Sequence, residues 1–535
     1  MKRIVLENVL VEDYAAEGRS LAKLDGKVIF IENVVPGDVV DVRLGKNKKD
    51  WAEGYPVQFH SYSNERVEPF CQHFGVCGGC QWQMLPYAKQ LEYKQKQVYD
   101  NLKRIGKIEL PEMLPIVGSE KDKFYRNKLE YTFSTKEYTV APPPPRRRDL
   151  AAAQPSLVND TDTNNDSSQK SGATSPQPSP EGEGAAAAQP PLVNESAQDN
   201  ESLKRRPGVQ DNPSVGGRGA VLGFHAKGFF DKIVDIKKCW LQHDLTNNIR
   251  NGVREFALEN NLSFYDIRAH RGLLRTMQVR ICTTGEVMVN IVFGNESEKQ
   301  RTKVLEFVKN TFPQITTLLY TVNLKMNDSM HDLEPQVYTG NGYVIERLED
   351  FEFKIGAKSF FQTNTKQAER LYGITRQFAE LNGSQTVYDL YCGTGSIGIF
   401  CSKGAKKIVG VEMQAAAIED AKENATINNI QHSFFVSGDV IDICKDAFFD
   451  EHGKPDVIIT DPPRAGMHQK LVEKILEIEA PIVVYVSCNP ATQARDLNLL
   501  DAKYKVTKVQ PVDMFPHTHH IENIVQLKLN KKTDE

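Results

Sequence analysis

The alternation of apolar and polar residues divides the chain into a β-rich first part and a strand–helix second part. Over residues 1–60, short runs of β-branched and aromatic residues alternate with turn signals such as Asp25-Gly26. From about residue 356 to the end, the alternation predicts a parallel α/β sheet with helices on both faces. Its six expected strands are VYDLYC, KIVGVE, SFFVSGD, DVIITDPP, IVVYVSC and IVQLKL.

The first sixty residues predict a small antiparallel β-barrel. Five short strands in a segment of this length can hide their edges only if the sheet closes on itself. Pro36-Gly37-Asp38 lies between two β-rich runs and predicts a hairpin at that point. A purely structural β-cap fits the same pattern, so the barrel alone assigns no function.

Residues 61–140 and 218–355 are interpreted as one central β-rich domain. A helix is expected from Tyr87 to Ile105, because Leu91, Val98 and Leu102 fall on one face. We expect this helix to pack on the C-terminal domain, which spans residues 356–535. The strand-like sequence FYRNKLEYTFS precedes the break at residue 140, and strand-like sequence resumes after residue 218.

Residues 141–217 are predicted to be a disordered low-complexity insertion. Within it, AAAQPSLVN at 151–159 recurs nearly unchanged as AAAQPPLVN at 186–194. So short a duplication inside polar, proline-rich sequence cannot build a hydrophobic core. The insertion therefore interrupts the β-rich domain rather than separating two domains.

The composition excludes a membrane protein, and it predicts that any contact with RNA depends on local groups of basic residues. With 40% hydrophobic and 25% charged residues the chain has an ordinary globular composition, and 535 residues require several domains. No apolar run of about 18 residues and no signal-peptide core occurs, so we expect a cytoplasmic protein without a membrane partner, and a monomer. The net charge of −4 gives no global attraction for nucleic acid, so any such contact must be local.

The sequence Gly393-Thr-Gly395-Ser-Ile-Gly398 has the G-x-G-x-x-G pattern between an expected strand and an expected helix. Glycines there let backbone N–H groups and a helix N-terminus approach a ligand closely. Glu412 ends the next strand, 19 residues after Gly393, where a carboxylate can bind ribose hydroxyls. Taken alone, this pattern predicts a dinucleotide site, and an NAD-dependent oxidoreductase is a competing hypothesis.

Three acidic residues favour S-adenosylmethionine (SAM) as the ligand. Asp389 stands just before the glycines, where a carboxylate would repel a pyrophosphate but suits the ammonium end of SAM. Asp439 follows the third strand and could lie near the adenine. Asp461 opens the sequence D-P-P-R, which resembles loops beside the transferred methyl group in Rossmann-like methyltransferases.

Cys488 stands at the C-terminal end of the expected strand IVVYVSC. Ligands of open α/β sheets bind at those strand ends, although an isolated cysteine is most often a small buried hydrophobe. The buried role is expected for Cys392, Cys401 and Cys444. A thiolate that adds to carbon-6 of uracil makes carbon-5 nucleophilic enough to take a methyl group from SAM, which is covalent catalysis.

Such a reaction also needs a base that removes the proton from carbon-5. Glu522, which enters the last expected strand, is a plausible carboxylate base. The histidines of FPHTHH just before it are the rival.

Four segments, DLYCGTG, DPPR, VSCNPATQARD and FPHTHHIEN, together resemble the RNA uracil-5-methyltransferase family of the RumA/RlmD type. The resemblance covers roughly residues 1–140 and 218–535. It implies a Rossmann-like SAM-dependent methyltransferase domain at the C-terminus, with Cys488 as nucleophile and Glu522 as base. It also implies SAM contacts at Gln362, Tyr391, Ser396, Glu412, Asp439 and Asp461, although asparagine is common in the family where Ser396 stands.

Cys71, Cys77 and Cys80 form a tight group with Gly78-Gly79 between the last two. In a chain without an export signal, clustered thiols more often hold metal than disulfides. We choose Cys239 over His73 as the fourth ligand, because it lies just before a domain change and completes four thiolates. Zinc suits such a set as well. The x5 gap followed by CGGC resembles the family's [4Fe–4S] pattern, which implies a central iron–sulfur domain with a structural and RNA-positioning role.

RNA contact is expected in two places. The first sixty residues resemble a TRAM domain, an OB-like RNA-binding barrel. A basic group without an intervening acid consists of four arginines and one histidine: Arg268, His270, Arg271, Arg275 and Arg280. Arg126 and Lys128 add to this group. We expect this group to contact phosphates beside an extruded or unpaired uridine.

These observations predict a SAM-dependent RNA (uracil-5-)-methyltransferase. The expected substrate is 23S ribosomal RNA, because an N-terminal TRAM domain together with a cysteine cluster resembles the ribosomal branch of the family. Transfer RNA is the alternative within the class. An iron–sulfur, nucleotide-binding oxidoreductase is the alternative outside it.

Overall fold

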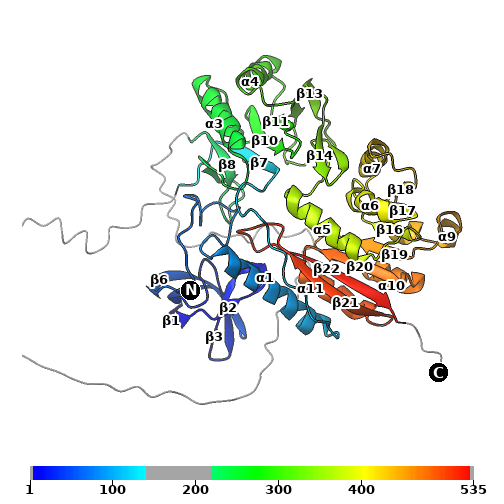
Figure 1. The fold of residues 1–535 in the computed structure, drawn as a ribbon. Coiled ribbons are helices and arrows are strands. Elements are labelled where there is room, and N and C mark those ends of the chain that lie inside the picture. Colours follow the sequence, from blue (N-terminus) through cyan, green and yellow to red (C-terminus); the bar gives the residue numbers. More distant parts are fainter. Residues whose placement is uncertain (1–3, 140–218, 531–535) are drawn as a thin grey trace, which may run out of the picture. The chain divides into compact units, whose positions relative to one another are not determined.

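The computed structural model describes residues 4–139 and 219–530, which form four β-sheets and the helices that cover them (Figure 1). The predicted insertion at 141–217 lies outside the described residues.

The N-terminal sheet contains six strands in the order β1-β5-β6-β4-β3-β2. Their bounds are β1 (Val5–Leu10), β2 (Asp13–Tyr14), β3 (Ser20–Leu24), β4 (Lys27–Ile31), β5 (Val39–Asn47) and β6 (Trp51–Ser61). Apolar side chains of β1, β3, β4 and β5 form a small core of their own. The sheet thus has one strand more than the sequence predicts, and the pair β4–β6 is parallel rather than antiparallel.

The predicted hairpin at Pro36-Gly37-Asp38 is wrong, although the turn itself exists. β4 pairs with β3 and β6, whereas β5 pairs with β1 and β6, so the strands on either side of the turn are not partners. The carboxylate of Asp38 accepts hydrogen bonds from the backbone N–H groups of Val35 and Ser63 and from Arg66. These bonds fix the turn without pairing the strands that flank it. The turn at Asp25-Gly26, by contrast, joins the paired strands β3 and β4.

The central sheet contains seven strands in the order β13-β12-β11-β10-β7-β8-β9. Their bounds are β7 (Lys128–Ser134), β8 (Val221–His225), β9 (Ile233–Asp235), β10 (Leu274–Ile281), β11 (Val287–Phe293), β12 (Thr317–Val322) and β13 (Gln336–Thr339). Helices α3 (Asp244–Glu259) and α4 (Glu298–Thr311) contribute apolar residues to its core. Ser134 of β7 pairs with Val221 of β8, so the chain on the two sides of residues 140–218 belongs to one sheet.

Helix α1 (Tyr87–Asn101) continues into a π-helical turn, η2 (Leu102–Gly106). Val98 and Leu102 pack into the same apolar cluster as strands of the C-terminal sheet. The buried residues of α1 also include Gln90 and Lys94, two polar residues one turn apart.

A hairpin of β14 (Val344–Leu348) and β15 (Phe351–Ile355) precedes helix α5 (Thr365–Phe378) and the C-terminal sheet. That sheet has seven strands in the order β18-β17-β16-β19-β20-β22-β21. Their bounds are β16 (Thr386–Leu390), β17 (Lys407–Glu412), β18 (Ser433–Ser437), β19 (Val457–Thr460), β20 (Ile482–Ser487), β21 (Tyr504–Val512) and β22 (Glu522–Leu529).

Two features of this sheet differ from the prediction. β21 was not expected, and β22 runs antiparallel to both β20 and β21, so the sheet is not wholly parallel. The antiparallel pairing matters for the site, because it brings the start of β22 to the end of β20.

Both faces of the C-terminal sheet are covered, because neighbouring residues of each strand point to opposite sides. Val387 and Val484 face the cluster that includes α5, α6 (Ser396–Cys401) and α7 (Ala415–Ile427). Tyr388 and Val483 face the cluster that includes α10 (Gln469–Ile478), α11 (Pro490–Leu500) and the end of α1. Two short helices, α8 (Val440–Ile443) and α9 (Asp446–His452), and the turn η3 (Ser402–Gly404) complete this part.

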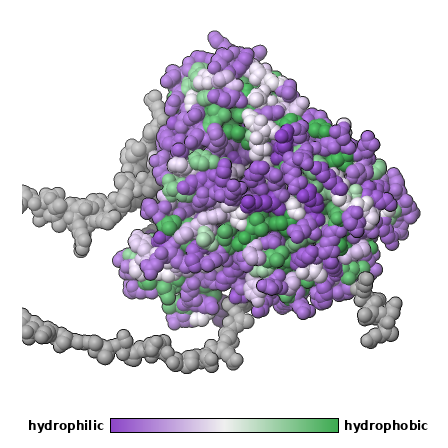
Figure 2. Space-filling model, viewed as in Figure 1, coloured by the Kyte–Doolittle hydropathy of each residue, from purple (hydrophilic) through white to green (hydrophobic). Residues whose placement is uncertain are grey.

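The expected buried cysteines are buried as predicted: Cys392, Cys401 and Cys444. The face shown in Figure 2 is mostly hydrophilic with separate apolar patches. In the part of the chain that the structure describes, no helix has both the length and the apolar character needed to cross a membrane.

Candidate active site

The parallel strands of the C-terminal sheet end at one edge, and most of the predicted site residues follow them there. Leu390 of β16 pairs with Val411 of β17 and with Thr460 of β19, and Thr460 pairs with Tyr485 of β20. Glu412 is the last residue of β17, and the loops after the other three strands begin at Tyr391, Asp461 and Cys488. This is the edge at which ligands of open α/β sheets bind.

The loop after β16 is shaped by residues with positive φ. Tyr391, Gly393 and Gly395 have φ angles of 63°, 53° and 77°, a region that glycine adopts readily and tyrosine rarely. Gly398 must lack a side chain, because a Cβ there would lie 2.9 Å from Ile408 and 3.0 Å from Oδ2 of Asp389. The loop therefore turns sharply between β16 and α6.

Asp389 lies inside the fold rather than at the surface of the loop. Its Oδ2 accepts a hydrogen bond from the Gly398 N–H group at 2.8 Å, and burial raises its pKa to about 7. The other oxygen, Oδ1, is buried without a hydrogen-bond partner in the described chain. The carboxylate thus organises the start of α6 and leaves one acceptor for a further donor.

A cavity of about 370 Å³ opens beside this loop. It is lined by Tyr391, Val411, Glu412, Met413, Gly438, Asp439, Val440, Ile441, His468, Lys470 and Leu471. Glu412 is held at its rim, since Oε2 accepts from the N–H of Gly393 at 3.3 Å and Oε1 from the N–H of Gln414 at 2.9 Å. Three of the six predicted SAM contacts, Tyr391, Glu412 and Asp439, therefore line one cavity.

The other three predicted contacts do not line that cavity. The Ser396 hydroxyl lies 3.1 Å from the Tyr372 hydroxyl, and Gln362 is buried with its carbonyl accepting from Asn127. Asp461 belongs to a second group of side chains with Cys488 and Glu522.

Strand pairing explains how Cys488 and Glu522 come together. Ser487 of β20 pairs with Asn523 of β22 in an antiparallel register, so the next residues toward the edge, Cys488 and Glu522, face each other. Both carboxylates influence the thiol: burial raises the pKa of Cys488 to about 12, and Glu522 and Asp461 add to the rise. Arg464 acts in the opposite direction on this pKa.

The pKa values of the two neighbouring carboxyl groups, those of Glu522 and Asp461, are raised as well. Burial, followed by the nearby Asp461, raises the pKa of Glu522 well above its ordinary value, and Arg464 lowers it. Burial raises the pKa of Asp461 to about 7. A thiol, two perturbed carboxyl groups and one arginine at the end of a sheet are a typical arrangement for proton transfer and covalent chemistry.

Arg464 contacts both the segment before Glu522 and the segment after Cys488. One of its Nη atoms lies 2.9 Å from Nδ1 of His520, and its carbonyl accepts from Asn489 at 3.0 Å and from Thr492 at 3.2 Å. The D-P-P-R loop is therefore fastened to the loop that carries Cys488.

The rival histidines are poor bases in this environment. Burial lowers the pKa of His519 to about 4 and that of His520 to about 3. Burial also lowers the pKa of His517, whose φ of 65° and hydrogen bond to Gln90 point to a structural role. A base is most effective when its pKa lies near the working pH, so the raised Glu522 suits the task better.

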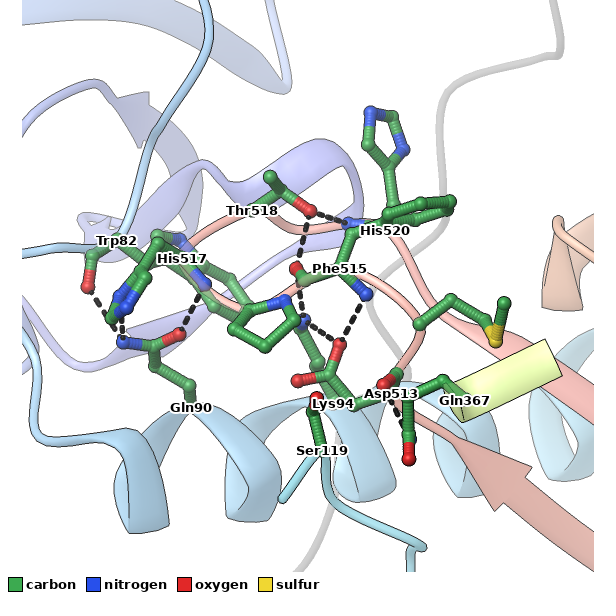
Figure 3. Close-up of polar contacts among 12 residues, drawn as sticks. Trp82, Gln90, Lys94, Ser119, Gln367, Asp513, Phe515, His517, Thr518 and His520 are labelled. Carbon is green, nitrogen blue, oxygen red and sulfur yellow. Dashed lines mark hydrogen bonds and ion pairs between the residues drawn. The ribbon is translucent and has the colours of Figure 1, made fainter. Parts of the chain in front are cut away.

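The loop from Asp513 to Ile521, here named the catalytic loop, is anchored by residues that the sequence reasoning did not select. Gln90 and Lys94 project from α1 toward it (Figure 3). Lys94 Nζ donates to Asp513 Oδ1 at 2.6 Å and to the Phe515 carbonyl at 3.2 Å. The Gln90 amide contacts His517 through both its oxygen and its nitrogen. Two polar residues one turn apart on a predicted buried helix face were the available signal.

Two further segments touch the catalytic loop. The N–H groups of Gln81 and Trp82 donate to the His517 carbonyl at 2.9 and 3.1 Å. Gly18, at the end of the turn η1 (Ala16–Gly18) between β2 and β3 of the N-terminal sheet, approaches so closely that a Cβ there would lie 2.7 Å from Cβ of His519. The N-terminal sheet and the cysteine-bearing segment therefore both meet the loop that leads to Glu522.

The four predicted metal ligands lie near one another, but not as a closed site. Burial raises the pKa of the Cys77 and Cys80 thiols to about 12, and both Cys71 and Cys239 add to each rise. Across residues 4–139 and 219–530, however, no group of three or more histidine, cysteine, aspartate or glutamate side chains is placed so that it could hold a metal ion.

A buried arginine beside Cys239 bears on whether these thiols suit an anionic metal cluster. Arg250 is fully buried, and its hydrogen-bond partners are neutral: the Lys237 carbonyl, Asn247, Asn251 and Tyr131. No ion pair joins it to a carboxylate of the described residues, and its Nε has no partner there. A buried charge is costly without compensation, so a thiolate-bound centre of net negative charge fits the donor set.

The basic group proposed for RNA contact is only partly at the surface. Arg275 and Arg280 are 1% and 0% exposed, so their expected contact with phosphates is wrong. Arg275 donates to three carbonyls and pairs with Asp328, because strand β10 directs it into the fold. Arg268, His270 and Arg271 are exposed, as the sequence predicts.

Two family models and several relatives match the chain. The model of the tRNA (uracil-5-)-methyltransferase family matches residues 274–530, and that of the TRAM domain matches residues 7–57. A protein of Bacteroides thetaiotaomicron named as an uncharacterized RNA methyltransferase is 47% identical over 96% of this chain and 100% of its own length. One of the same description from Porphyromonas gingivalis is 42% identical over 97% and 99%.

A solved structure extends the likeness to the whole chain. The tRNA (uracil-54, C5)-methyltransferase of Pyrococcus abyssi in complex with S-adenosyl-L-homocysteine has a TM-score of 0.66 and 26% identity. The match covers 97% of this chain and 100% of that one.

Proposed function

Because the chain belongs to the tRNA (uracil-5-)-methyltransferase family and carries an N-terminal TRAM domain, we propose that it methylates carbon-5 of a specific uridine in 23S ribosomal RNA. Its fold is that of a SAM-dependent methyltransferase, and it is an RNA methyltransferase. The proposed product is 5-methyluridine, formed through a covalent bond between Cys488 and the uracil ring. The observation that carries the proposal is the pairing register that sets Cys488 against Glu522.

Cys488 is the proposed nucleophile. Addition of its sulfur to carbon-6 breaks the 5,6 double bond and places electron density on carbon-5 and on the carbonyl oxygen at carbon-4. Carbon-5 then takes the methyl group. SAM supplies that group as an electrophilic methyl on a sulfonium, and leaves as the neutral thioether.

The thiol must lose its proton for this addition, and the site controls when that happens. With a pKa of about 12 the free thiol is almost entirely protonated at neutral pH. Arg464 favours the thiolate through its charge. A cationic ligand near Asp461 would remove part of the opposing negative charge, so attack is coupled to a filled site.

Glu522 is the proposed base. After methyl transfer, carbon-5 still holds its original proton, and its removal drives elimination of the Cys488 sulfur and restores the double bond. The raised pKa of the Glu522 carboxyl makes it a better acceptor for that proton than an ordinary carboxylate. His519 and His520, with pKa values of about 4 and 3, are the weaker candidates.

The proposed SAM-binding residues are Gln362, Tyr391, Ser396, Glu412, Asp439 and Asp461. The cavity that Tyr391, Glu412 and Asp439 line together supports these three members of the set. The unpaired buried Oδ1 of Asp389 gives a further acceptor close to the glycine loop. Glu412 suits ribose hydroxyls, because both its oxygens are already oriented by backbone N–H groups.

We further propose that Cys71, Cys77, Cys80 and Cys239 hold a [4Fe–4S] cluster in the central domain, with zinc as the alternative. Their mutual proximity and the uncompensated charge of Arg250 support an anionic centre. The cluster would fix the segment whose Gln81 and Trp82 support the catalytic loop.

We also propose three domains: residues 1–60, residues 61–140 together with 218–355, and residues 356–535.

Transfer RNA is the second candidate substrate. The family model and the Pyrococcus abyssi neighbour are both named for transfer RNA. The ribosomal proposal depends on the combination of TRAM domain and cysteine cluster. The more distant alternative, an iron–sulfur oxidoreductase, finds no support in the comparisons.

Incubation of the purified full chain with SAM and either ribosomal or transfer RNA, followed by digestion to nucleosides, tests the proposal. We expect 5-methyluridine from 23S ribosomal RNA. Its appearance from transfer RNA alone would select the second substrate, and another methylated nucleoside from both RNAs would contradict the proposal.

A further inference from the structure

A cluster of aromatic rings and lysines lies beside the catalytic loop and has no part in the chemistry derived so far. Its rings are Phe70, Phe124 and Trp240, with centroids 6.0 Å apart for Phe70–Trp240 and 5.7 Å apart for Phe124–Trp240. Lys123 Nζ lies 4.1 Å from the Phe70 ring centroid, and Lys238 Nζ lies 4.1 Å from that of Trp240. The five side chains, here named the aromatic–lysine cluster, come from three segments of the chain.

Phe124 is presented to solvent at a cost in backbone energy. Its φ is 55°, which a residue with a bulky side chain rarely adopts, and 37% of it is exposed. The conformation is held by a hydrogen bond of 2.7 Å from the Phe124 N–H to the Trp240 carbonyl. Backbone strain that exposes an apolar ring is found mostly at functional sites.

The charge beside these rings is positive. Lys123 makes no ion pair within the described residues, whereas Lys238 lies 3.5 Å from Asp244. Lys121 and Lys237, next in the same segments, are exposed, and Lys237 pairs with Asp235. The nearest acid of the Lys123 segment, Asp122, points to His517 at 3.4 Å. One lysine above an aromatic ring therefore remains available to an anion.

The cluster is continuous with the proposed active site. The Phe70 ring lies 4.9 Å from the His517 ring in the catalytic loop. From Phe124 the chain runs on to Arg126, whose guanidinium lies over the Phe515 ring, and to Asn127, which donates to the Gln362 carbonyl. Three residues of extended chain span about 10 Å at most, so Phe124 lies within about that distance of Asn127, the residue that contacts the proposed SAM ligand Gln362.

We propose that the aromatic–lysine cluster binds an unpaired nucleotide of the substrate RNA, next to the uridine that enters the active site. The base stacks on the exposed Phe124 ring, which itself packs against Trp240. The Lys123 ammonium group binds the phosphate. Aromatic rings bind bases by stacking and lysines neutralise phosphates, which is how single-stranded RNA is recognised. This inference rests on the proposed function for the identity of the ligand.

RNA fits the cluster better than a protein partner does. Phe124 is exposed, Phe70 and Trp240 are partly buried, and lysine ammonium groups lie over the latter two rings, so the cluster offers a stacking face rather than a continuous apolar patch. Sequence-specific RNA recognition mostly targets single-stranded loops, in which the nucleotides that flank a target base are also unpaired and free to stack on aromatic side chains.

Binding of the full chain to a fluorescently labelled oligouridine tests the proposal without turnover. Phe124→Asn removes the ring and keeps a residue that tolerates positive φ, so the fold should be preserved. We expect its Kd to rise about 5- to 150-fold, the cost of losing one stacked base. Lys123→Gln should lower the slope of log Kd against log salt by about one, whereas Phe124→Asn should leave that slope unchanged.

Phe434→Asn is the matched control, because Phe434 is also an exposed ring, with Lys407 Nζ 4.6 Å from its centroid, and lies on edge strand β18. It should bind as the unaltered chain does. Photo-cross-linking of an oligouridine that contains 5-iodouridine should modify Phe124 or Trp240. Unchanged affinity of Phe124→Asn, or cross-links only elsewhere, would overturn the site even if 5-methyluridine forms. Loss of affinity in a chain that makes no 5-methyluridine would keep the site and reject the proposed function.

Discussion

Lys94 Nζ lies 2.6 Å from Oδ1 of Asp513, and neither side chain is exposed to solvent. The pair joins helix α1 to the catalytic loop, nine residues before Glu522 in the sequence. Tyr87 donates to the second oxygen of Asp513 at 2.8 Å, so the carboxylate is fully engaged. Helix α1 thus positions the loop that leads to the proposed base.

Lys94→Met should destabilise the chain and slow methyl transfer. It leaves Asp513 charged and buried without its cation, a change that typically costs about 3–5 kcal/mol. We expect a lower thermal unfolding midpoint and a lower kcat, with the KM for SAM little changed because the cavity of Glu412 and Asp439 does not include this pair.

Lys96→Met is the control for that experiment. Lys96 lies on the same helix, but its side chain is 47% exposed and its ion pairs with Asp13 and Asp100 are at the surface. Such pairs contribute about 0–1 kcal/mol. Equal effects of the two substitutions would contradict a positioning role for the buried pair.

Arg464→Gln should move the pH–rate profile to higher pH. Arg464 lowers the pKa of both the Cys488 thiol and the Glu522 carboxyl, so its loss lets both rise. Both groups then lose their protons only at higher pH, and the rate at neutral pH falls about tenfold for every pH unit by which the profile moves. Arg464→Lys should recover part of the rate. A profile that keeps its inflection and only loses amplitude would mean that Arg464 acts through structure alone.

Cys488→Ala should abolish methyl transfer while leaving SAM affinity within a few fold, because the cavity proposed to bind SAM is not lined by this thiol. Calorimetric titration with SAM and counting of methyl groups in RNA measure the two effects. Cys282→Ala, at a buried cysteine of the central domain, should retain activity. Appreciable turnover by Cys488→Ala would exclude the covalent route.

Anaerobically purified protein should contain iron and acid-labile sulfide, and Cys239→Ser should lose most of both. Arg250→Met should lose the metal faster to a chelator than the unaltered chain, because a buried cation beside Cys239 stabilises an anionic cluster. Elemental analysis distinguishes iron from zinc. Zinc without sulfide would replace the iron–sulfur proposal.

The local sequence was sufficient to place the candidate site residues that directly follow a strand. Glycine spacing, D-P-P-R and the cysteine after β20 each mark the carboxyl edge of the sheet, so Tyr391, Asp461 and Cys488 could be placed from the sequence alone. The antiparallel course of β22 could not be read from IVQLKL, because an apolar run buried on both faces is the same in either direction. Only the register shows that Glu522 faces Cys488.

Side-chain direction limited the rest. A run of arginines reads as a basic surface, but β10 is covered on both faces, so neighbouring residues of the strand are buried and Arg280 is among them. Gln90 and Lys94 could be noticed as polar residues on a buried helix face, but their partners lie about 420 residues away along the chain, so no local pattern could identify those partners.

The most direct test of the central claim is to trap and map the bond between enzyme and RNA. Glu522→Gln should add Cys488 to the uracil and transfer the methyl group but fail to remove the carbon-5 proton, so that a complex stable to denaturing gels accumulates. After digestion with protease and nuclease, mass spectrometry should find a methylated uridine nucleotide on the peptide containing Cys488. The double variant Cys488→Ala/Glu522→Gln should form no complex. An unmodified Cys488 in the Glu522→Gln protein, with normal turnover, would contradict the account.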